Sequence, residues 1–470
     1  MAHLLVVGGG IGGLATALLA ARHGHTAELF ERDTRAPGAA LDRDFFGWRR
    51  PAVPQANQPH TLLGAARAVL REELPDVHAE MLRLGARERH ELDWFDVRPP
   101  ARPGDEDLVM LQARRIVLES ALTTALRAEP GVVCRYGEPV TGLVTEAAPG
   151  APGAPRVTGV RTAAGRYVGD LVVDAGGRRG VTERWLAAAG CRPGVVERHR
   201  TGLAYFCRWY RLPPGTAEGP RRPWTVAGGH FAGCAVFPAD NRTFAVALFV
   251  HTGDPTRTAL RDPAVFEAAA RCFTPGAVWL DLGAQPLSEV WATAGLDNRW
   301  CALVDEQGPV VTGFVPVGDA VTHTNPTLAQ GASLTLWAAL RIARTAGHRD
   351  PGSAAYAVAH HAWAVRTLKP WFDFQVGADA AVGERYATGA PRTGAAREAA
   401  ALFDCALDDP EVMRARARVR HLAEAPERAY ADPVVRARVA QWLAARPDYV
   451  PGAAGPDRET WEKVTGSGAG

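Results

Sequence analysis

The first stretch of the chain limits its fold more than any other. Residues 4–7 are four apolar residues typical of a buried strand, and Gly8, Gly10 and Gly13 follow with the spacing G-x-G-x-x-G before a helix rich in Ala and Leu. Glycine lets the turn be tight, lets the backbone approach a pyrophosphate and lets the helix pack on the strand. Unpaired amides at the helix N-terminus attract phosphate. The sequence therefore predicts an α/β, Rossmann-type domain that binds a dinucleotide.

An acidic residue at the end of the next predicted strand fits the same interpretation. The strand of residues 27–30 ends at Glu31, about twenty positions after Gly10. A carboxylate there accepts hydrogen bonds from ribose hydroxyls and repels a 2′-phosphate. The motif does not choose between NAD and FAD, and a purely structural glycine turn is the alternative.

Composition excludes several classes of function. The net charge is only +2, which indicates neither a nucleic-acid footprint nor a polybasic membrane anchor. The seven cysteines are scattered and never form C-x-x-C, so neither a disulfide framework nor a metal site is predicted. No stretch is apolar for the length of a membrane span. We expect a soluble protein of the reducing cytoplasm.

Two further segments carry candidates for the dinucleotide site. Three closely spaced prolines forbid a helix and hold Arg50, Gln55 and His60 on a stiff loop. Arg114 and Arg115 begin a predicted helix, where arginines oppose the helix dipole unless an anion such as a diphosphate lies nearby. An ordinary connection and two solvated arginines are the alternatives.

The sequence of residues 131–175 predicts short strands. A linker rich in Pro, Gly and Ala at 147–155 separates two of them. The last strand, at 171–175, enters a second glycine turn at Gly176-Gly177. A second turn of this kind is expected if the dinucleotide domain continues there.

From about residue 201 the pattern changes to antiparallel β-structure. Residues 205–210 form an aromatic strand, and 243–250 return after a turn at 238–241. Alternate apolar residues of the return strand predict a sheet with one covered face. Some side chains of this sheet are candidates for a substrate pocket, with core packing as the alternative: Tyr205, Cys207, Trp209 and Phe237.

Residues 310–333 are the stretch that selects the cofactor. A strand delivers Gly318-Asp319 at its C-terminal end, a proline-bearing loop follows, and Gly331 stands near the start of a helix ending around residue 346. Asp319 can accept hydrogen bonds from sugar-alcohol hydroxyls. Gly331 permits a flat ring to lie against the helix N-terminus, whose dipole stabilises negative charge on that ring. Such an arrangement suggests a reduced flavin.

With these three motifs the sequence resembles the FAD-dependent monooxygenases that include p-hydroxybenzoate hydroxylase, squalene epoxidase and the bacterial polyether epoxidases. The resemblance covers roughly residues 1–350 and is closest in motif to the polyether epoxidase-like members. It implies that His60 lies near the flavin ring as a catalytic candidate. It assigns FAD binding to residues of the motifs and their flanks: Gly8, Gly10, Gly13, Glu31, Arg32, Arg50, Arg115, Gly318, Asp319, Pro326, Gln330, Gly331 and Ala332.

The resemblance also implies a GR2-type flavoprotein organisation, with a Rossmann-type FAD-binding domain, an inserted antiparallel β-sheet substrate domain and a C-terminal helical region. The expected boundaries are 1–185 for the first part of the FAD domain, with part of the substrate domain near 75–107, then 186–300 for the β-sheet domain, 301–350 for the rest of the FAD domain, and 351–470 for the helical region.

Two expectations concern the C-terminal region. An arginine-rich helix at 412–422 is expected to be solvated, with a partner surface as the alternative. Residues 466–470 are expected to be disordered.

The implied activity is insertion of one oxygen atom from O2, through a flavin C4a-hydroperoxide, into a hydrophobic or aromatic small molecule. Epoxidation and hydroxylation both stay open, and the setting is expected to be natural-product biosynthesis. Gly176 stands where the family carries Asp, so electrons are expected from NAD(P)H or from a separate flavin reductase. The alternatives are a dehydrogenase or reductase that moves hydride without oxygen and a non-catalytic flavoprotein.

Halogenation is not expected from this sequence. Flavin halogenases require an active-site lysine and a W-x-W-x-I-P motif. Lysine occurs here only at Lys369 and Lys463, and the motif is absent.

Overall fold

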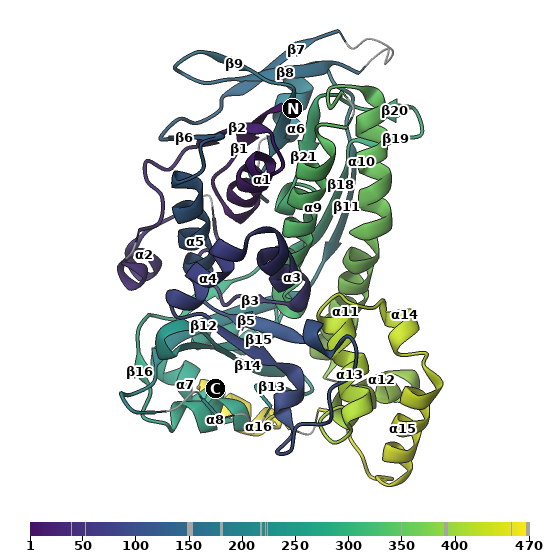
Figure 1. Ribbon diagram of the computed structural model, residues 1–470. Helices are drawn as coiled ribbons and strands as arrows, with labels where there is room; N and C mark the ends of the chain where they lie inside the picture. The colour runs from purple at the N-terminus through teal and green to yellow at the C-terminus, as the bar shows by residue number, and fades with distance from the viewer. Residues whose placement is uncertain are drawn as a thin grey trace.

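A five-stranded parallel sheet forms the upper part of the molecule in Figure 1. The computed structural model describes residues 1–466 except 39, 52, 148–153, 179–181, 217–218, 221, 223, 349, 390–392 and 453. The strands of this sheet come from three distant regions of the chain, in the order β21-β10-β1-β2-β6. They are Phe314–Pro316 (β21), Leu171–Asp174 (β10), His3–Val7 (β1), Thr26–Glu31 (β2) and Val132–Tyr136 (β6). The Rossmann-type fold predicted from the first motif is confirmed.

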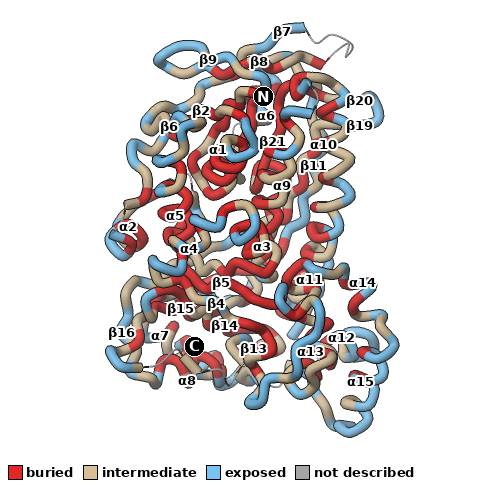
Figure 2. Tube along the Cα trace, viewed as in Figure 1, coloured by how far each residue is buried: buried red, intermediate tan, exposed pale blue. Residues whose placement is uncertain are grey.

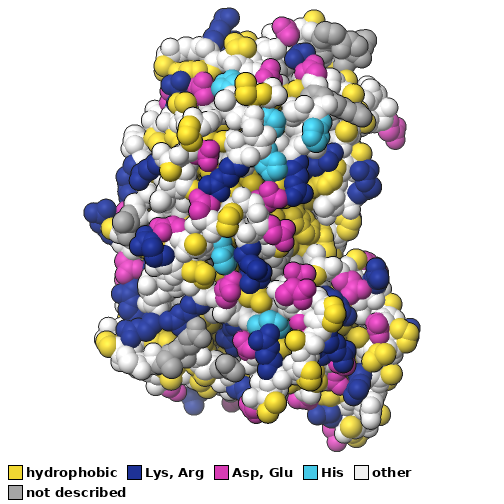
Figure 3. Space-filling model, in the orientation of Figure 1, with side chains coloured by type: hydrophobic (Ala, Val, Ile, Leu, Met, Phe, Trp, Pro, Cys, Tyr) yellow, Lys and Arg dark blue, Asp and Glu magenta, His cyan; other side chains and the backbone are white. Residues whose placement is uncertain are grey.

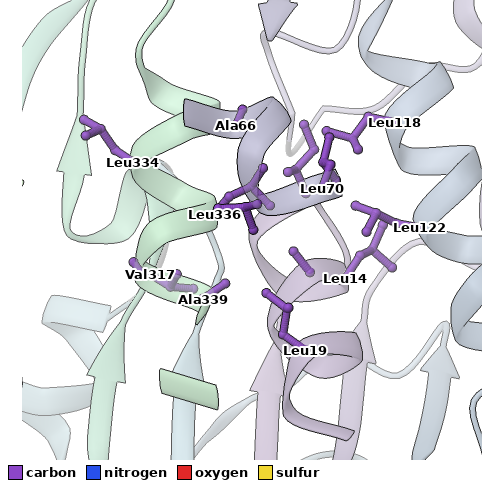
Figure 4. Packing of buried hydrophobic residues seen from close by; sticks show 14 of the residues in the cluster. Leu14, Leu19, Ala66, Leu70, Leu118, Leu122, Val317, Leu334, Leu336 and Ala339 are labelled. Atoms are coloured by element: carbon purple, nitrogen blue, oxygen red, sulfur yellow. The ribbon is translucent and has the colours of Figure 1, made fainter. Parts of the chain in front are cut away.

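Helices cover this sheet through a continuous apolar core. Figure 4 shows leucines of helix α1 meeting leucines of α3, α5 and α9, all of them buried. Small residues of α1 let these helices approach closely, and each buried leucine contributes roughly 1.5–3 kcal/mol. The helices of this upper body are Ile11–Arg22 (α1), Leu41–Gly47 (α2), Gly64–Glu73 (α3), Pro75–Arg83 (α4), Arg115–Arg127 (α5), Thr182–Ala188 (α6) and Gly331–Thr345 (α9).

Four smaller sheets surround this core. Residues 61 and 62 pair with the strand at 109–112, so the following helix begins at Gly64. Figure 2 shows more exposed residues in the sheet of β7, β8 and β9 than in the parallel sheet. The predicted linker at 147–155 lies mostly outside the described residues. The strands are Thr61–Leu62 (β3), Arg87–His90 (β4) and Val109–Gln112 (β5); Gly142–Glu146 (β7), Arg156–Arg161 (β8) and Arg166–Val168 (β9); Val195–Arg200 (β11), Asp297–Ala302 (β18) and Thr322–His323 (β22); and Val304–Asp305 (β19) and Gly308–Pro309 (β20).

A six-stranded antiparallel sheet forms the lower body. As predicted, alternate residues such as Phe244 and Val246 pack on one covered face, against helices α7, α8 and α16. The opposite face points toward the upper body. The strands are Leu203–Arg211 (β12), Val226–Gly228 (β13), Ala232–Pro238 (β14), Thr243–His251 (β15), Gln285–Pro286 (β16) and Trp291–Thr293 (β17), and the covering helices are Pro263–Arg271 (α7), Thr274–Leu280 (α8) and Arg458–Thr465 (α16).

In Figure 1, α10 runs along the upper body near β19 and β20, while α12, α13 and α15 lie beside the lower body. Residues 354–388 form two successive helices, and the second begins at Lys369 with a proline in its first turn. The last helix, α16, leaves this group and packs into the covered face of the lower sheet. The helices are Ala354–Thr367 (α10), Lys369–Thr388 (α11), Gly394–Cys405 (α12), Pro410–Arg420 (α13), Pro426–Ala429 (α14) and Pro433–Ala444 (α15).

The arginine-rich helix α13 is not the solvated helix that was expected. Arg414 is 3% exposed and donates to the carboxylate of Asp105. Arg420 pairs with the buried Glu91 at 2.8 Å. The sequence prediction was wrong because these partners come from residues more than 300 positions away, which a local charge pattern does not reveal. The C-terminal residues 467–470 lie outside the described part of the chain.

No bilayer-crossing helix is found among the residues that the structure describes. The visible face carries interspersed positive and negative side chains, as Figure 3 shows. This mixture agrees with the small net charge of the sequence.

Candidate functional site

A cavity of about 1510 Å³ runs from the carboxyl ends of the parallel strands to the open face of the lower sheet. Strands β1, β2 and β10 each deliver residues to its wall, as expected for a ligand site of an open α/β sheet. Most of the residues predicted from sequence line this one cavity: Gly8, Gly10, Glu31, Arg32, His60, Arg115, Tyr205, Phe237, Gly318, Asp319, Pro326, Gln330, Gly331 and Ala332. Gly13, Arg50, Cys207 and Trp209 do not line it.

The first glycine turn has no room for side chains at two of its positions. Gly8 has φ +107°, and a Cβ there would lie 2.6 Å from the carbonyl oxygen of Ala175. A Cβ at Gly13 would lie 1.8 Å from the carbonyl oxygen of Gly8. Gly13 therefore acts in packing rather than in the cavity wall. The tight turn brings the N-terminus of α1, which has no acid in its first turn, to the cavity as a cradle for an anion.

The carboxylate of Glu31 is tied to this turn. It accepts hydrogen bonds from the backbone amides of Gly9 and, at 2.8 Å, Asp33. These bonds hold the end of β2 against the glycine turn. Each carboxylate oxygen can accept more than one hydrogen bond. Glu31 can therefore also accept hydrogen bonds from the ribose hydroxyls of a ligand in the cavity.

Arg115 is held at the cavity wall by a buried carboxylate that sequence reasoning missed. Its Nε donates to Glu119 Oε1 at 2.8 Å, and Arg50 Nη1 donates to Glu119 Oε2 at 2.5 Å. Burial alone would raise the pKa of Glu119, but the charges of Arg115 and Arg50 outweigh burial and hold the pKa below its ordinary value. Arg50 also pairs with Asp33 at 3.5 Å, so Arg115 is the arginine that brings positive charge to Gly10, where a diphosphate would lie. Arg50 contacts the same carboxylate as Arg115 but does not line the cavity wall.

Arg114, the other arginine at this helix start, fits neither of the two sequence interpretations. It is fully buried and donates from Nε and Nη2 to the buried carboxylate of Asp240, with a further ion pair to Asp42 at 2.8 Å. Arg114 therefore joins the upper and lower bodies. It neither faces solvent nor lines the cavity.

Two motifs predicted separately contact each other across the cavity. Gln55 of the proline-containing loop donates from Nε2 to Asp319 Oδ2 at 3.0 Å. Gly318 adopts φ +63°, which turns the chain after β21 and presents Asp319 to the cavity. This contact fixes the loop of residues 50–60 over the carboxyl end of the sheet.

The N-terminus of α9 has buried polar atoms without partners among the described residues. Gln330 is 1% exposed and its Oε1 has no hydrogen-bond partner, and the same holds for the hydroxyl of the buried Ser333. An unsatisfied buried acceptor costs roughly 1–3 kcal/mol. Gln330 lines the cavity and Ser333 does not, so a ligand that donates a hydrogen bond to Gln330 Oε1 would offset the cost at that atom. Gln330 Oε1 and the uncapped α9 N-terminus fit the polar edge of a flavin ring.

His60 lines the cavity as a neutral imidazole. Its Nδ1 lies 2.8 Å from the carbonyl oxygen of Gln58, which can only accept, so Nδ1 carries the proton and Nε2 is a free acceptor. Burial and the charge of Arg115 lower the pKa of His60 to about 4. His60 can therefore accept a hydrogen bond or a proton at neutral pH.

A buried carboxylate also stands where the second glycine turn begins. Asp174, two positions before Gly176, lines the cavity and accepts hydrogen bonds from the Gly176 amide at 2.8 Å and from the hydroxyl of Thr182. Burial raises the pKa of Asp174 to about 6. The expected acid is thus absent at Gly176, but a carboxylate lies close to that turn.

Only one end of the open face of the lower sheet lines the cavity, and this end forms the apolar half of the cavity. Tyr205 and Phe237 line it, together with residues of α11. Trp209 packs edge-on against Phe45 with 5.0 Å between ring centroids, and its Nε1 donates to Asn57. The segment of residues 41–58 therefore covers the end of the sheet that carries Cys207 and Trp209. The prediction of a pocket role for these two residues does not hold for this cavity.

A buried polar network joins this half of the cavity to the loop of residues 325–327, which precedes α9. Asp379 of α11 is 2% exposed, and among the described residues its hydrogen-bond donors are neutral side chains. Tyr205 donates to Asn325, which in turn donates to Asp379 at 2.8 Å. The other donors to Asp379 are Asn298, Thr327 and Gln375. Sequence reasoning missed this network, because its members come from separate elements and each has an ordinary local pattern.

Comparison with known families finds one match in the N-terminal region. The family described as the NAD(P)-binding Rossmann-like domain matches residues 6–72. Protein Rv3254 of Mycobacterium tuberculosis is 27% identical over 442 residues, covering 86% of this chain and 85% of that protein.

Several solved structures share the fold at low sequence identity. Flavin-dependent brominase Bmp2 has a TM-score of 0.60 and 14% identity, covering 94% of this chain and all of that one. PqsL, a probable FAD-dependent monooxygenase from Pseudomonas aeruginosa, has a TM-score of 0.55 and 18% identity, with coverages of 82% and 99%. OxyS anhydrotetracycline hydroxylase from Streptomyces rimosus has a TM-score of 0.56 and 16% identity, with coverages of 90% and 76%. The chain has the Rossmann-type fold of these proteins, with the additional antiparallel sheet and helices.

Proposed function

We propose that this chain is an FAD-dependent monooxygenase that inserts one oxygen atom from O2 into a hydrophobic or aromatic small molecule, by epoxidation or hydroxylation. One observation carries the proposal. The three motifs that suggest FAD and the apolar face of the lower sheet line the same continuous cavity. A cofactor held at one end would therefore face a substrate held at the other.

The residues at the upper end fit FAD in the order of its chemical groups. Glu31 would hold the adenosine ribose, while the Gly8–Gly13 turn and Arg115 would hold the diphosphate. Asp319 would hold the ribityl chain, and the N-terminus of α9 at Gly331 and Ala332 would hold the ring. Once reduced, bound FAD supplies the activation of O2.

The chain itself would bind, orient and exclude water. The apolar wall that includes Phe237, Phe249 and Ala247 would hold an aromatic or aliphatic substrate and keep water from the reacting atoms. The positive end of the α9 dipole would stabilise negative charge on the ring. His60 Nε2 is the candidate acceptor for a proton near the ring.

Neither lysine of the chain is placed to act as the active-site lysine of a halogenase in this cavity. Lys369 pairs with Glu197 and Asp373 and does not line the cavity, and neither does Lys463. Among the activities named for the similar structures, this favours oxygen insertion into carbon over halogenation.

We propose that electrons come from NAD(P)H or from a separate flavin reductase. The chain lacks an aspartate at Gly176, which supports the reductase. We also expect the enzyme to act in the cytoplasm, on a small-molecule product of biosynthesis.

The test combines flavin retention with labelled oxygen. The purified chain is expected to retain FAD, and a candidate aromatic substrate is expected to gain one labelled oxygen atom from isotopically labelled O2, measured by mass spectrometry with and without an added flavin reductase. Turnover of substrate under anaerobic conditions would instead identify a dehydrogenase or reductase of the same fold. Tight binding of NAD in place of FAD would overturn both.

A further inference from the structure

Three arginines of the C-terminal helices line the end of the cavity farthest from the glycine turn: Arg385, Arg416 and Arg420. Figure 1 places α13, which carries Arg416 and Arg420, low in the molecule and α1 in its upper part, so this end of the cavity is remote from the proposed diphosphate site. The FAD phosphates therefore do not account for them.

Arg416 differs from the other three arginines of α13. Arg414 pairs with Asp105, Arg418 with Glu424 and Arg420 with Glu91. The guanidinium of Arg416 has no carboxylate partner among the described residues. It lies 4.6 Å from the ring of Trp224 and 5.3 Å from the ring of Phe403.

The acidic groups near Arg416 are engaged elsewhere. Glu91 accepts from Arg420 at 2.8 Å and from His421 at 3.1 Å. Asp404 accepts from the hydroxyl of Tyr449. Burial lowers the pKa of Arg416, and the charge of Arg420 lowers it further. A partly buried cation without a counter-ion is unfavourable unless a ligand neutralises it.

Arg385 of α11 is a second arginine without an acidic partner. It has no ion pair among the described residues, and its Nε is buried without a hydrogen-bond partner. Its Nη2 lies 3.5 Å from the position that a Cβ on Gly228 would occupy. Trp224 lies four residues before Gly228, the last residue of β13, so their Cα atoms lie within roughly 13 Å of each other. The two unpaired arginines thus flank one short stretch of the cavity wall.

We infer that Arg416, assisted by Arg385, forms a carboxylate-binding subsite for the substrate at this end of the cavity. A guanidinium presents a planar fork that matches a carboxylate, and the rings of Trp224 and Phe403 keep water from one side of that fork. The substrate class is an apolar molecule that carries one carboxylate away from the carbon to be oxidised. This inference rests on the proposed function, because it places the substrate in the same cavity as FAD.

The test uses two probes that differ only in their acidic group, 1-pyrenebutyric acid and 1-pyrenebutanol. Binding to the purified full-length protein is measured by calorimetric titration. The acid is expected to bind at least about tenfold more tightly than the alcohol, because a charge-assisted, bidentate hydrogen bond is worth about that factor. Equal affinities for the two probes would overturn the inference.

Arg418 supplies a matched control on the same helix. Arg416→Gln is expected to remove most of the preference for the acid, while Arg418→Gln, with the same change of charge, is expected to keep it. Arg416→Lys is expected to restore part of it. An equal loss in Arg416→Gln and Arg418→Gln would show a general electrostatic effect and would overturn the subsite.

The flavin content of each sample separates this inference from the proposed function. A protein without flavin that still prefers the acid, with the preference lost in Arg416→Gln, would refute the monooxygenase and keep the subsite. A protein that retains FAD and inserts oxygen but shows no preference for the acid would keep the monooxygenase and refute the subsite.

Discussion

At the scale of single residues, the glycines of the first motif have two different roles. Gly8 and Gly13 are required by close contact between backbone atoms, whereas the space where a Cβ on Gly10 would lie is bounded only by Arg115 Nη2 at 3.4 Å. Gly10 is therefore the position at which the helix N-terminus is open to the cavity. The glycine motif therefore reflects close backbone packing as well as a binding site.

We expect Gly13→Ala to lose FAD and to destabilise the fold. The added Cβ would lie 1.8 Å from the Gly8 carbonyl oxygen, so the turn must move, at a cost of about 1–3 kcal/mol. Denaturant unfolding and the ratio of flavin to protein measure the two effects. Gly47→Ala, with no atom within 4 Å of its Cβ, is the control. A Gly13→Ala protein with as much flavin as this control would contradict the proposed role of the turn.

His60 gives a prediction for pH. Its folded pKa is about 4, below its ordinary value of 6.5, so the unfolded chain takes up the proton first as pH falls through this window. The free energy of unfolding should therefore fall from pH 6.5 toward 4, by up to about 1.4 kcal/mol per pH unit from this group. Above pH 6.5 the group has no effect. His60→Gln should show a shallower fall, and parallel curves for the two proteins would contradict a neutral, half-buried His60 in the cavity wall.

At the scale of elements, the C-terminal helices divide between two tasks. α11, α12 and α13 line the cavity, while α16 completes the core of the lower sheet. Trp461 of α16 is fully buried against Phe231 and Phe273, and its Nε1 donates to Thr256. The end of the chain is thus part of the β body.

Trp461→Ala is expected to lower the free energy of unfolding by about 3–5 kcal/mol, because it leaves a large cavity in this core. Chemical denaturation followed by circular dichroism measures this loss. Val450→Ala, at a half-exposed position in the same C-terminal region, is expected to have little effect. The folded Trp461→Ala protein should keep its flavin, since Trp461 lies outside the cavity wall. A loss no larger than that of Val450→Ala would show that α16 is not docked as described.

At the scale of the whole molecule, one cavity has two chemically distinct ends. The upper end is lined by backbone turns and charged side chains, and the lower end by the open sheet face and the C-terminal helices. The buried network around Asp379 connects the two ends. Because different residues line the two ends, we expect cofactor binding and substrate binding to be separable by mutation.

Ala247→Phe tests this separation. Ala247 lies on β15 in the wall of the lower end, so a phenyl ring there would fill substrate space. We expect the FAD content to be unchanged and kcat/KM for an accepted substrate to fall at least about tenfold, the factor that 1.4 kcal/mol of lost binding gives. Absorbance of the bound flavin and steady-state oxygen consumption measure the two effects. Loss of flavin in Ala247→Phe would show that the ends are not independent.

Sequence patterns predicted those parts whose structure follows from local rules. The strand, glycine turn and helix at residues 3–22, the covered face of β15 and the Gly318-Asp319 turn all appear as expected. Tyr205 and Trp209 share one face of β12, yet only Tyr205 reaches the cavity, because residues 41–58 cover the other end. Periodicity gives the face of a strand but not what packs on it.

The sequence by itself determined that this chain has a Rossmann-type dinucleotide domain, because glycine spacing and strand-helix alternation are local constraints on the backbone. Only the tertiary structure decided that Glu119 holds Arg115, that Asp379 joins α11 to the loop before α9, and that Arg416 lacks, among the described residues, the carboxylate partner that its neighbours on α13 have. The physical reason is the same for all three. The charge and burial of a side chain depend on groups that the fold brings together from distant parts of the chain.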